Sequence, residues 1–301
     1  MNKLKEIITE DGTLSLRDLK IKENFHNSTG ALKETKHKFI NPSKLERFKD
    51  HSVNVLDICF GLGYNSALLF NRLLKQSSKT IWYGLEIDKR PLEYSINNKS
   101  FKELWNPKII DIYNSFLLND SFKDNFFECK LMWGDARKEI SKLPSNISFD
   151  LIFLDGFSPQ KCPEIWTIEF LSKLSNKLKK DGNIVTYSSA AAVRKTFIDL
   201  GLKIYTIKPI DNSKNIWSNG TIAKKNINDK DISNNSFIKK LSIMEIEHLR
   251  TKASIPYRDP SGKASSEEII NKRDKEQLSS DLLNTNYWRS KWKMPKSSIN
   301  S

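Results

Sequence analysis

The stretch Asp57-Ile-Cys-Phe-Gly61-Leu-Gly63-Tyr-Asn65 follows an apolar, β-branched run at Val53–Ile58. Such a run is typical of a buried parallel strand. The two glycines permit a tight turn and a close approach of the backbone to a ligand at the start of the next helix. A second run, Leu151–Leu154, leads in the same way into Asp155-Gly-Phe-Ser-Pro159. Ligands of open α/β sheets bind beyond the carboxyl ends of such strands, so we expect both loops to face one crevice.

Outward from these loops the chain alternates between strand and helix patterns, which predicts an α/β fold with a doubly wound, mostly parallel sheet. The expected strands are Val53–Ile58, Thr80–Ile87, Cys129–Trp133, Leu151–Leu154, Asn183–Tyr187 and Lys203–Ile207, with an antiparallel edge strand at Asn219–Ala223. The expected helices are Tyr64–Gln76, one after Pro91, Phe101–Phe127, Arg137–Leu143, Ile165–Leu178 and Ala191–Leu200, with a turn at Lys179–Gly182.

Three parts are expected along the chain. Residues 1–50 form an N-terminal extension that contributes to the active site, 51–224 the core, and 225–301 a linker and C-terminal extension. In the first part the sequence predicts a hairpin around Asp11-Gly12, and then a short helix that Asn41-Pro42 stops near Ile40. In the last part a linker at 225–236 precedes a helix capped from Ser265.

The composition favours a cytoplasmic protein that meets a polyanion. The 301 residues carry 50 Lys and Arg against 36 Asp and Glu, a net charge of +14, which favours binding to phosphates. The alternative is that the basic residues lie on solvated surfaces that bind no polyanion. Three separated cysteines without a CxxC pair indicate neither a disulfide framework nor a zinc site. The N-terminus lacks the apolar segment of a signal peptide, and no stretch is apolar enough to span a membrane.

Acidic residues at the ends of successive strands support a ligand-binding role for the glycine loop. Glu86 ends the second strand at about the spacing at which an acid binds ribose hydroxyls in such sheets. Asp135 ends the third strand and can accept a hydrogen bond from an exocyclic amine. The structural alternatives are a solvated carboxylate for Glu86 and a helix N-cap for Asp135. A Gly-x-Gly pair alone is weak, and Ser66 stands where a dinucleotide fingerprint has its third glycine.

Together with Asp57, these acids describe a pocket for a nucleoside with a free ribose and an amino base. No phosphate-binding Gly-Lys-Ser/Thr loop follows the first strand. The cationic nucleoside S-adenosylmethionine therefore fits this pocket better than a nucleotide does.

The motifs of the chain resemble those of the methyltransferase part of the MnmC family. The resemblance rests on Asp57-x-x-Phe-Gly-x-Gly-Tyr-Asn65, Gly134-Asp-Ala-Arg137 and the long run Phe153-Leu-Asp-Gly-Phe-Ser-Pro-x-Lys161-x-Pro-Glu-Ile-Trp166-Thr, and further stretches such as Phe25-His-Asn-Ser-x-Gly30-Ala-x-x-Glu34 and Ile255-Pro-Tyr-Arg-Asp-Pro260 extend it over nearly the whole chain. It implies S-adenosylmethionine-dependent conversion of 5-aminomethyl-2-thiouridine to 5-methylaminomethyl-2-thiouridine at the tRNA wobble position.

The resemblance also implies the cofactor, the partner and the binding residues. The partner is the anticodon region of tRNA, and neither a metal nor FAD is expected, because the chain resembles the stand-alone form that lacks the fused oxidase. Another enzyme would then supply the aminomethyl precursor. The implied cofactor-binding residues are Asp57, Phe60, Gly61, Gly63, Asn65, Glu86, Asp135, Ala136 and Asp155.

Asp155 is the candidate catalytic residue, because it ends the fourth strand, where the methyl donor and the acceptor amine would meet. Its carboxylate would orient the amine and accept its proton. The alternative is that it only braces the following turn. The remaining candidates for substrate binding are Phe157, Lys161, Trp166, Arg194 and Arg258. Lys161 could instead cap a helix, and Arg137, Arg194 and Arg258 could form ordinary ion pairs.

Two other functions share these features. A polyamine aminopropyltransferase has the same fold and strand-end acids, but the positive charge of this chain argues against a cationic polyamine substrate. A non-catalytic RNA-binding protein on a decayed methyltransferase fold is the other alternative, and the intact acids at 57, 86, 135 and 155 count against it.

Overall fold

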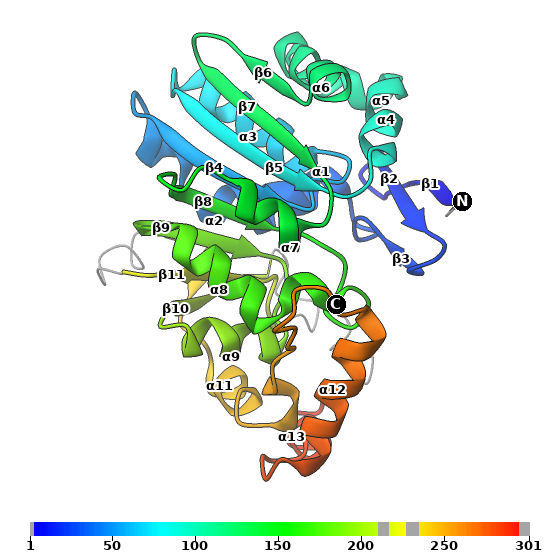
Figure 1. The fold of residues 1–301 in the computed structure, drawn as a ribbon, viewed down its shortest axis with the longest axis vertical. Coiled ribbons are helices and arrows are strands. Elements are labelled where there is room, and N and C mark those ends of the chain that lie inside the picture. The colour runs from blue at the N-terminus through cyan, green and yellow to red at the C-terminus, as the bar shows by residue number, and fades with distance from the viewer. Residues whose placement is uncertain (1–2, 210–216, 227–234, 295–301) are drawn as a thin grey trace. The chain divides into compact units, whose positions relative to one another are not determined.

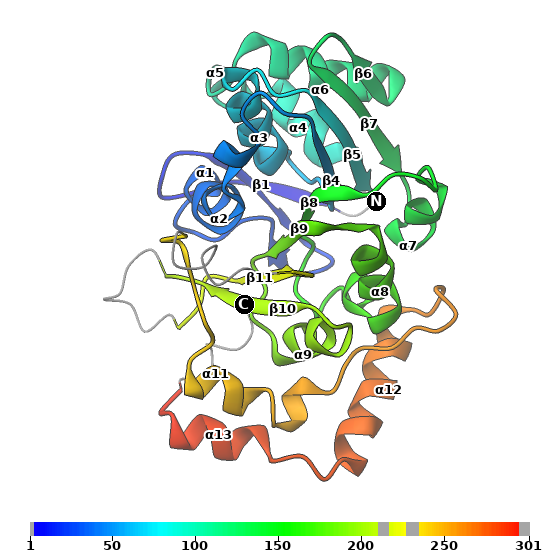
Figure 2. The ribbon, with the colours of Figure 1, turned by 90° about the vertical axis from the view of Figure 1, so that its left-hand side faces the viewer.

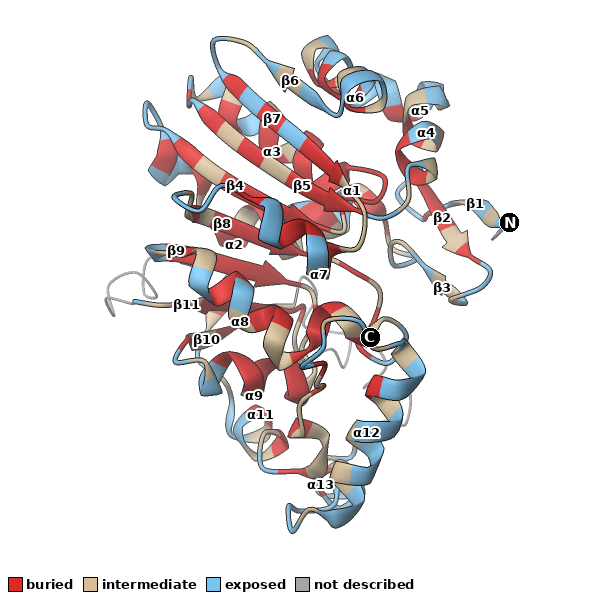
Figure 3. Ribbon diagram, in the orientation of Figure 1, coloured by how far each residue is buried: buried red, intermediate tan, exposed pale blue. Residues whose placement is uncertain are grey.

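The apolar run before the glycine loop forms strand β4, Val53–Ile58 (Figure 1). A computed structural model of the protein describes residues 3–209, 217–226 and 235–294. β4 pairs in parallel with β5, Thr80–Glu86, on one side and with β8, Phe149–Leu154, on the other. β4 and β8 are buried over most of their length (Figure 3), as a strand covered on both faces must be.

Residues up to Phe157 form one compact unit, whose sheet has the order β8-β4-β5-β7-β6. β7, Phe127–Trp133, is parallel to β5, and β6, Ser121–Lys123, is an antiparallel edge strand. The carboxyl ends of β4, β5, β7 and β8 therefore lie along the same edge. The helices that connect these strands are α3 (Tyr64–Lys75), α4 (Arg90–Asn97), α5 (Lys99–Glu103), α6 (Pro107–Asn119) and α7 (Ala136–Glu139), which a 3₁₀ turn, Ile140–Lys142, continues.

The predicted helix Phe101–Phe127 is wrong in its last part. Helix α6 ends at Asn119, because Asp120 takes a left-handed conformation with φ 58°. The chain then forms the β6–β7 hairpin, whose turn is held by the Asp124 carboxylate accepting from the amides of Phe126 and Phe127.

The N-terminal hairpin is confirmed. Strands β1, Leu4–Ile8, and β2, Leu14–Asp18, pair antiparallel around Asp11-Gly12, and β3, Glu23–Asn24, completes a small sheet. The Asp11 side chain accepts hydrogen bonds from Thr13 and from the amide of Lys33, so the hairpin turn is tied to the first turn of the helix that follows. Figure 2 shows the ribbon of β1 beside this helix.

That helix does not stop at Ile40. It runs as α1, Ala31–Glu34, then as a π-helical segment, Thr35–Ile40, and then as α2, Asn41–Ser43, so the predicted stop at Asn41-Pro42 is wrong. A proline inside an α-helix removes one hydrogen bond and collides with the carbonyl four residues back. The wider π turn just before Pro42 is a known way for a helical path to continue past such a site.

Residues from Ser158 form a second compact unit with the strand order β12-β10-β11-β9. β9 runs from Leu178 to Thr186, so the turn predicted at Lys179–Gly182 is wrong. β11, Thr221–Lys224, is antiparallel as predicted, but it lies between β9 and β10 instead of at an edge. The other elements are a 3₁₀ turn (Pro163–Trp166), α8 (Ile168–Lys177), α9 (Ala191–Asp199), β10 (Lys203–Ile207) and β12 (Ile238–Lys239).

The chain ends in α11, Ile243–His248, α12, Ser266–Ser279, and α13, Thr285–Lys291. The predicted cap of α12 is confirmed, since Ser265 and Glu268 form a reciprocal capping box. Most of the predicted linker lies outside the described residues, and the boundaries at 50 and 224 stay predictions. The predicted α/β class with its N-terminal β extension is confirmed. No helix in the described ranges is long and apolar enough to cross a membrane.

Candidate functional site

The loop between β4 and α3 turns through three left-handed residues: Cys59 at φ 65°, Gly61 at 57° and Gly63 at 87°. A Cβ on Gly63 would lie 2.7 Å from the rings of both Phe60 and Tyr113, and the Tyr113 hydroxyl donates to the Gly63 carbonyl. Glycine is therefore required at 63 for space as well as for φ. The loop delivers the N-terminus of α3, whose N-cap is Gly63, to the edge of the sheet.

Glu86 holds this loop from the neighbouring strand. Its Oε2 accepts from the Gly61 amide at 2.7 Å, and its Oε1 accepts from the amides of Ile87 and Asp88 at 2.7 and 2.9 Å. Burial raises the pKa of the Glu86 carboxyl, while these amides oppose the shift. A carboxylate offers about four lone-pair positions, so Oε2 keeps the capacity to accept from a ligand hydroxyl.

Asp57 lies beneath the loop with one oxygen unsatisfied. Its Oδ2 accepts from the Ser66 hydroxyl at 2.6 Å, and Ser66 in turn accepts from the Trp82 indole at 2.8 Å. The Oδ1 is buried and has no hydrogen-bond partner among the described residues. Burial raises the pKa of Asp57 to about 7, and the negative charge of Glu86 adds to the shift. A buried acceptor without a partner is costly, and a positively charged ligand group would satisfy it.

The side chain of Phe60 points into the core instead of toward the edge of the sheet. Its ring packs edge-on against Trp82, Tyr113 and Phe116. Any contact of Phe60 with a cofactor would therefore be made by its backbone, and its ring supports the loop from below.

Asp135 caps α7, the alternative weighed for it. Its Oδ1 accepts from the Arg137 amide at 2.9 Å, and its Oδ2 pairs with the Arg137 guanidinium at 2.7 Å. Although burial raises its pKa, these bonds lower it overall. The Gly134 amide donates to the Glu86 carbonyl at 2.8 Å, which places the end of β7 beside Glu86. The roles of Asp135 and the buried Ala136 in cofactor binding stay predictions.

Asp155 follows β8 and is half-buried. Its Oδ2 accepts from the Asn65 amide nitrogen at 2.6 Å, so two residues predicted from separate motifs are in contact. Burial raises the pKa of Asp155 well above its usual range, and the charges of Glu34 and Asp57 raise it further. The Asn65 bond and Lys38 oppose these effects.

The sequence analysis assigned no role to several site residues of the N-terminal extension. Glu34 pairs with Lys38 at 2.6 Å, and both act electrostatically on Asp155. Phe25 packs edge-on against Phe157 with ring centroids 5.0 Å apart, and its ring is 3.4 Å from where a Cβ on Gly61 would be. The sequence did contain a hint of this role, because the stretch from Phe25 to Glu34 is one of those that resemble the methyltransferase part of the MnmC family.

The other substrate candidates belong to the second unit. Trp166 is fully buried and packs edge-on against Tyr187, while Lys161 is exposed. Arg258 pairs with Glu276 at 3.1 Å. For Arg137 and Arg258 the structure shows the ion pair, one of the two alternatives, and their contacts with RNA stay predictions.

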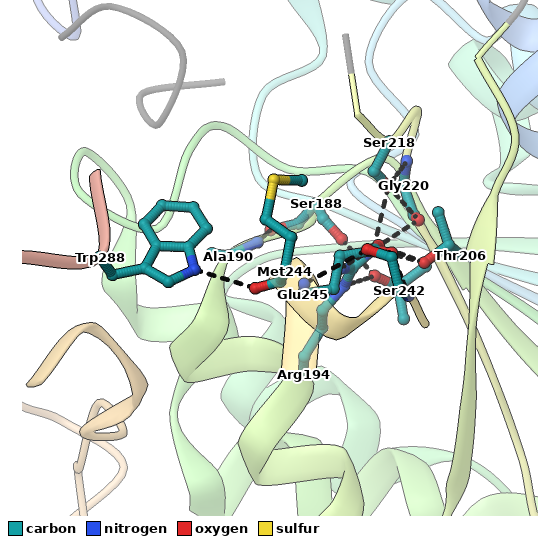
Figure 4. A network of polar contacts seen from close by, with 11 residues as sticks. Ser188, Ala190, Arg194, Thr206, Ser218, Gly220, Ser242, Met244, Glu245 and Trp288 are labelled. Atoms are coloured by element: carbon teal, nitrogen blue, oxygen red, sulfur yellow. Dashed lines mark hydrogen bonds and ion pairs between the residues drawn. The ribbon is translucent and has the colours of Figure 1, made fainter. Parts of the chain in front are cut away.

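Arg194 is different, because its side chain is only 1% exposed. It pairs with Glu245 at 2.8 Å and donates to the hydroxyls of Thr221 and Ser218 and to the Gly220 carbonyl (Figure 4). With its donors used inside the unit, Arg194 cannot reach an RNA phosphate in this conformation. Its prediction as a substrate-binding residue is wrong, and the ion-pair alternative holds.

Comparisons with known proteins give the following relationships. A family model described as S-adenosyl-L-methionine-dependent methyltransferase matches residues 100–219. An uncharacterized protein of Methanocaldococcus jannaschii is 28% identical over 97% of this chain and 78% of its own length.

The bifunctional protein MnmC of tRNA 5-methylaminomethyl-2-thiouridine biosynthesis from Leptospira interrogans is 26% identical over 60% of this chain. The match covers 30% of that protein, so this chain corresponds to only part of it. The crystal structure of MNMC2 from Aquifex aeolicus superposes with a TM-score of 0.78 at 27% identity, covering 93% of this chain and 87% of that one.

Proposed function

Since the chain is an S-adenosylmethionine-dependent methyltransferase of the MnmC type, we propose that it methylates the amine of 5-aminomethyl-2-thiouridine at the wobble position of tRNA. The product would be 5-methylaminomethyl-2-thiouridine, the nucleoside that the name of the bifunctional relatives carries.

The observation that carries this proposal is the surplus of acids around Asp155. Glu34 and Asp57 raise the pKa of Asp155, and Lys38 is the cation that opposes them. A site with more carboxylates than cations favours positively charged ligands. Both a sulfonium donor and a primary ammonium acceptor bring that charge.

The residues present fit the cofactor. The unpartnered Oδ1 of Asp57 is suited to a cationic group, the free capacity of Glu86 to ribose hydroxyls, and Gly61 and Gly63 to close backbone approach. When bound, S-adenosylmethionine supplies a methyl group on a positively charged sulfur, which leaves as a neutral thioether.

The chain's own part in the reaction is to handle the proton and to position the amine. The acceptor is protonated near neutral pH and must lose a proton before its nitrogen lone pair can form the new C–N bond. Asp155 would accept that proton, while the electrons of the broken C–S bond remain on sulfur. General-base assistance of this kind contributes about 10²–10⁴-fold to a rate, and holding the two reactants together supplies much of the rest.

The proposed partner is the anticodon region of tRNA. The net charge of +14 supports phosphate contacts, so affinity for tRNA is expected to fall steeply and log-linearly with salt concentration. Exposed basic residues such as Lys161 would make such contacts.

The test incubates the protein and S-adenosylmethionine with tRNA that carries the aminomethyl precursor, followed by mass analysis of the nucleosides. We expect a gain of one methyl group on that nucleoside, and a loss of about a hundredfold in Asp155→Asn. Asp150→Asn is the matched control, because Asp150 lies near the start of β8, the strand that Asp155 follows, and its carboxylate accepts from the Asn54 amide.

Two results would contradict the proposal. Methyl transfer to another nucleoside, with the aminomethyl group unchanged, would overturn the substrate. Transfer of an aminopropyl group from decarboxylated S-adenosylmethionine to a diamine, without methylation of tRNA, would favour the aminopropyltransferase instead.

A further inference from the structure

The side chains of Thr35, Asn65 and Asp155 form a largely buried chain of hydrogen bonds that links three separate elements. The Thr35 hydroxyl donates to Asn65 Oδ1 at 2.9 Å, and Asn65 Nδ2 donates to Asp155 Oδ2 at 2.6 Å. Thr35 begins the π-helical segment, Asn65 lies in the first turn of α3, and Asp155 follows β8. Thr35 and Asn65 are 1% and 7% exposed, so water does not readily replace the bond between them.

We infer that Thr35 and Asn65 are positioning residues that favour the ionised form of Asp155 and leave its Oδ1 to accept the proton of the substrate amine. This inference rests on the proposed function. Within the described part of the chain, Asn65 is the hydrogen-bond donor to the Asp155 carboxylate, and Oδ1 receives none. One oxygen is thus held by the protein and the other remains available.

Asn65 can position Asp155 because both the nitrogen and the oxygen of its side-chain amide form hydrogen bonds. An ionised carboxylate only accepts hydrogen bonds, so the amide nitrogen must face Asp155. The amide oxygen is then turned toward Thr35, whose hydroxyl satisfies it. Without that hydroxyl the buried oxygen would have no donor, and Asn65 would gain by turning away to find one.

The Thr35 hydroxyl bonds to a residue of α3 and not within its own helix. The Thr35 amide already donates back to the carbonyls of Ala31 and Leu32. Threonine in a helix often turns its hydroxyl to a carbonyl of the preceding turn. Here the hydroxyl points across to α3 instead, against which the π segment packs. Such widened turns are frequent at functional sites.

The surrounding charges make the bond to Asp155 necessary. Glu34 acts on Asp155 from α1 and Asp57 from β4, and both disfavour its ionised form. Lys38, from the π segment, favours that form but is shared with Glu34 at 2.6 Å. The neutral Asn65, on α3, adds a donor without adding charge. Its hydrogen bond thus opposes the two acids and keeps Asp155 able to take a proton.

The experiment compares Thr35→Val, which removes the hydroxyl at nearly constant shape, with Thr35→Ser, which keeps it. Thr80→Val is the matched control, because Thr80 is as buried as Thr35 and its hydroxyl donates to the nearby backbone carbonyl of Ser78. Thr80 starts β5, so it lies at the end of that strand away from Glu86. The full-length proteins are assayed for kcat across pH, for KM of tRNA and for the Kd of S-adenosylmethionine. In parallel, ¹³C-labelled aspartate is titrated by NMR, and the Asp155 signal is assigned by its loss in Asp155→Asn.

We expect Thr35→Val to lower kcat about tenfold or more, an effect of about 1.4 kcal/mol. The KM of tRNA and the Kd of S-adenosylmethionine should stay within about twofold of the wild-type values, because the substitution removes no contact that binds either ligand in the ground state. The Asp155 titration and the acid limb of the kcat profile should both move to higher pH. Thr35→Ser and Thr80→Val should resemble the wild type in each measurement.

Two outcomes overturn the inference, and they can be told apart. If the wild type methylates tRNA while Thr35→Val matches Thr80→Val in kcat and in the Asp155 titration, the hydrogen-bond chain has no positioning role. If the wild type transfers no methyl group to the amine, the proposed function fails, and the role in proton acceptance fails with it. In that case the NMR titration still reports whether Thr35 sets the ionisation of Asp155.

Discussion

The Glu86 carboxylate accepts a hydrogen bond from the Gly61 amide at 2.7 Å, so the acid that ends β5 holds the turn that follows β4. The group predicted to bind the ribose thus also shapes the loop predicted to approach the cofactor. If both predictions hold, cofactor binding and loop geometry are coupled through one side chain, and two substitutions at this position can separate them.

Glu86→Ala should weaken S-adenosylmethionine binding by about 1–3 kcal/mol, because it leaves buried amides and ribose hydroxyls without an acceptor. It should also lower the melting temperature of the free protein. Glu86→Gln keeps one acceptor oxygen for Gly61 and should retain more of the stability than of the affinity. Calorimetric titration and thermal melts of both variants check this. Wild-type affinity in Glu86→Ala would remove Glu86 from the site.

Gly63→Ala should destabilise the protein by about 1–3 kcal/mol or more, since it combines a positive φ with contacts of 2.7 Å to Phe60 and Tyr113. The control is Gly12→Ala, where φ is similar at 78° but nothing lies within 4 Å of the new Cβ. The difference between their unfolding free energies in urea isolates the steric part. Equal destabilisation by the two substitutions would mean that the loop accommodates the new Cβ at position 63 without steric strain.

Asp155→Asn should stabilise the cofactor-free protein while it abolishes most activity. Burial first, and then Glu34 and Asp57, raise the folded-state pKa of Asp155 above its ordinary value of 3.8, so the folded protein holds a proton that the unfolded chain releases. The stability that this bound proton contributes is therefore lost as the pH rises from 3.8 to the folded-state pKa, and it is absent at any higher pH.

The asparagine variant carries no such proton. Its stability relative to the wild type should increase with pH across this window and level off above it, as denaturant unfolding at several pH values would reveal. A constant difference at all pH values would mean that ionisation of Asp155 does not oppose folding.

Binding of S-adenosylmethionine should release a proton from Asp57 near neutral pH. Its pKa of about 7 leaves about half of the carboxyls protonated at pH 7, and a cationic ligand nearby lowers that pKa. The binding enthalpy, measured in buffers of different ionisation enthalpy, should then depend on the buffer. This dependence should shrink in Asp57→Asn. An unchanged dependence there would assign the proton to another group.

Arg194→Met should destabilise the protein by about 3–5 kcal/mol, because it leaves the Glu245 charge buried without its partner. Arg258→Met breaks a half-exposed pair with Glu276 and should cost only about 0–1 kcal/mol. Denaturant titrations give both numbers. If Arg194→Met unfolds like the wild type but binds tRNA more weakly, then the arginine does leave its buried site to contact RNA.

The parts of the site that could be predicted from the sequence are those set by local pattern. Two strands, β4 and β8, are predicted by their apolar runs alone, and the turn after β4 is predicted by its glycines. Because both strands belong to a parallel sheet, Asp57 and Asp155 are expected at the same edge of that sheet. Their chemistry follows from residue type and position.

The rest depends on partners that a local pattern does not contain. The ladder that pairs Asn183–Thr186 with β11 belongs to a strand that starts at Leu178, where the residues read as a turn. The arginine at 194 is the kind of residue that usually meets solvent, and only the distant Glu245 explains its burial. The bond from Thr35 to Asn65 joins segments 30 residues apart, and no local pattern in the sequence predicts that they meet.

The π-helical segment Thr35–Ile40 makes the length of the N-terminal helix part of the site. An α-helix advances about 100° per residue. Removal of one residue between Thr35 and Pro42 would allow a regular helix, yet it would rotate Glu34 and Thr35 by about that angle about the helix axis, away from Asn65. The spacing between Gly30 and Pro42 is thus more constrained than the identity of most residues within it, and chains that share this site can differ in sequence there more freely than in length.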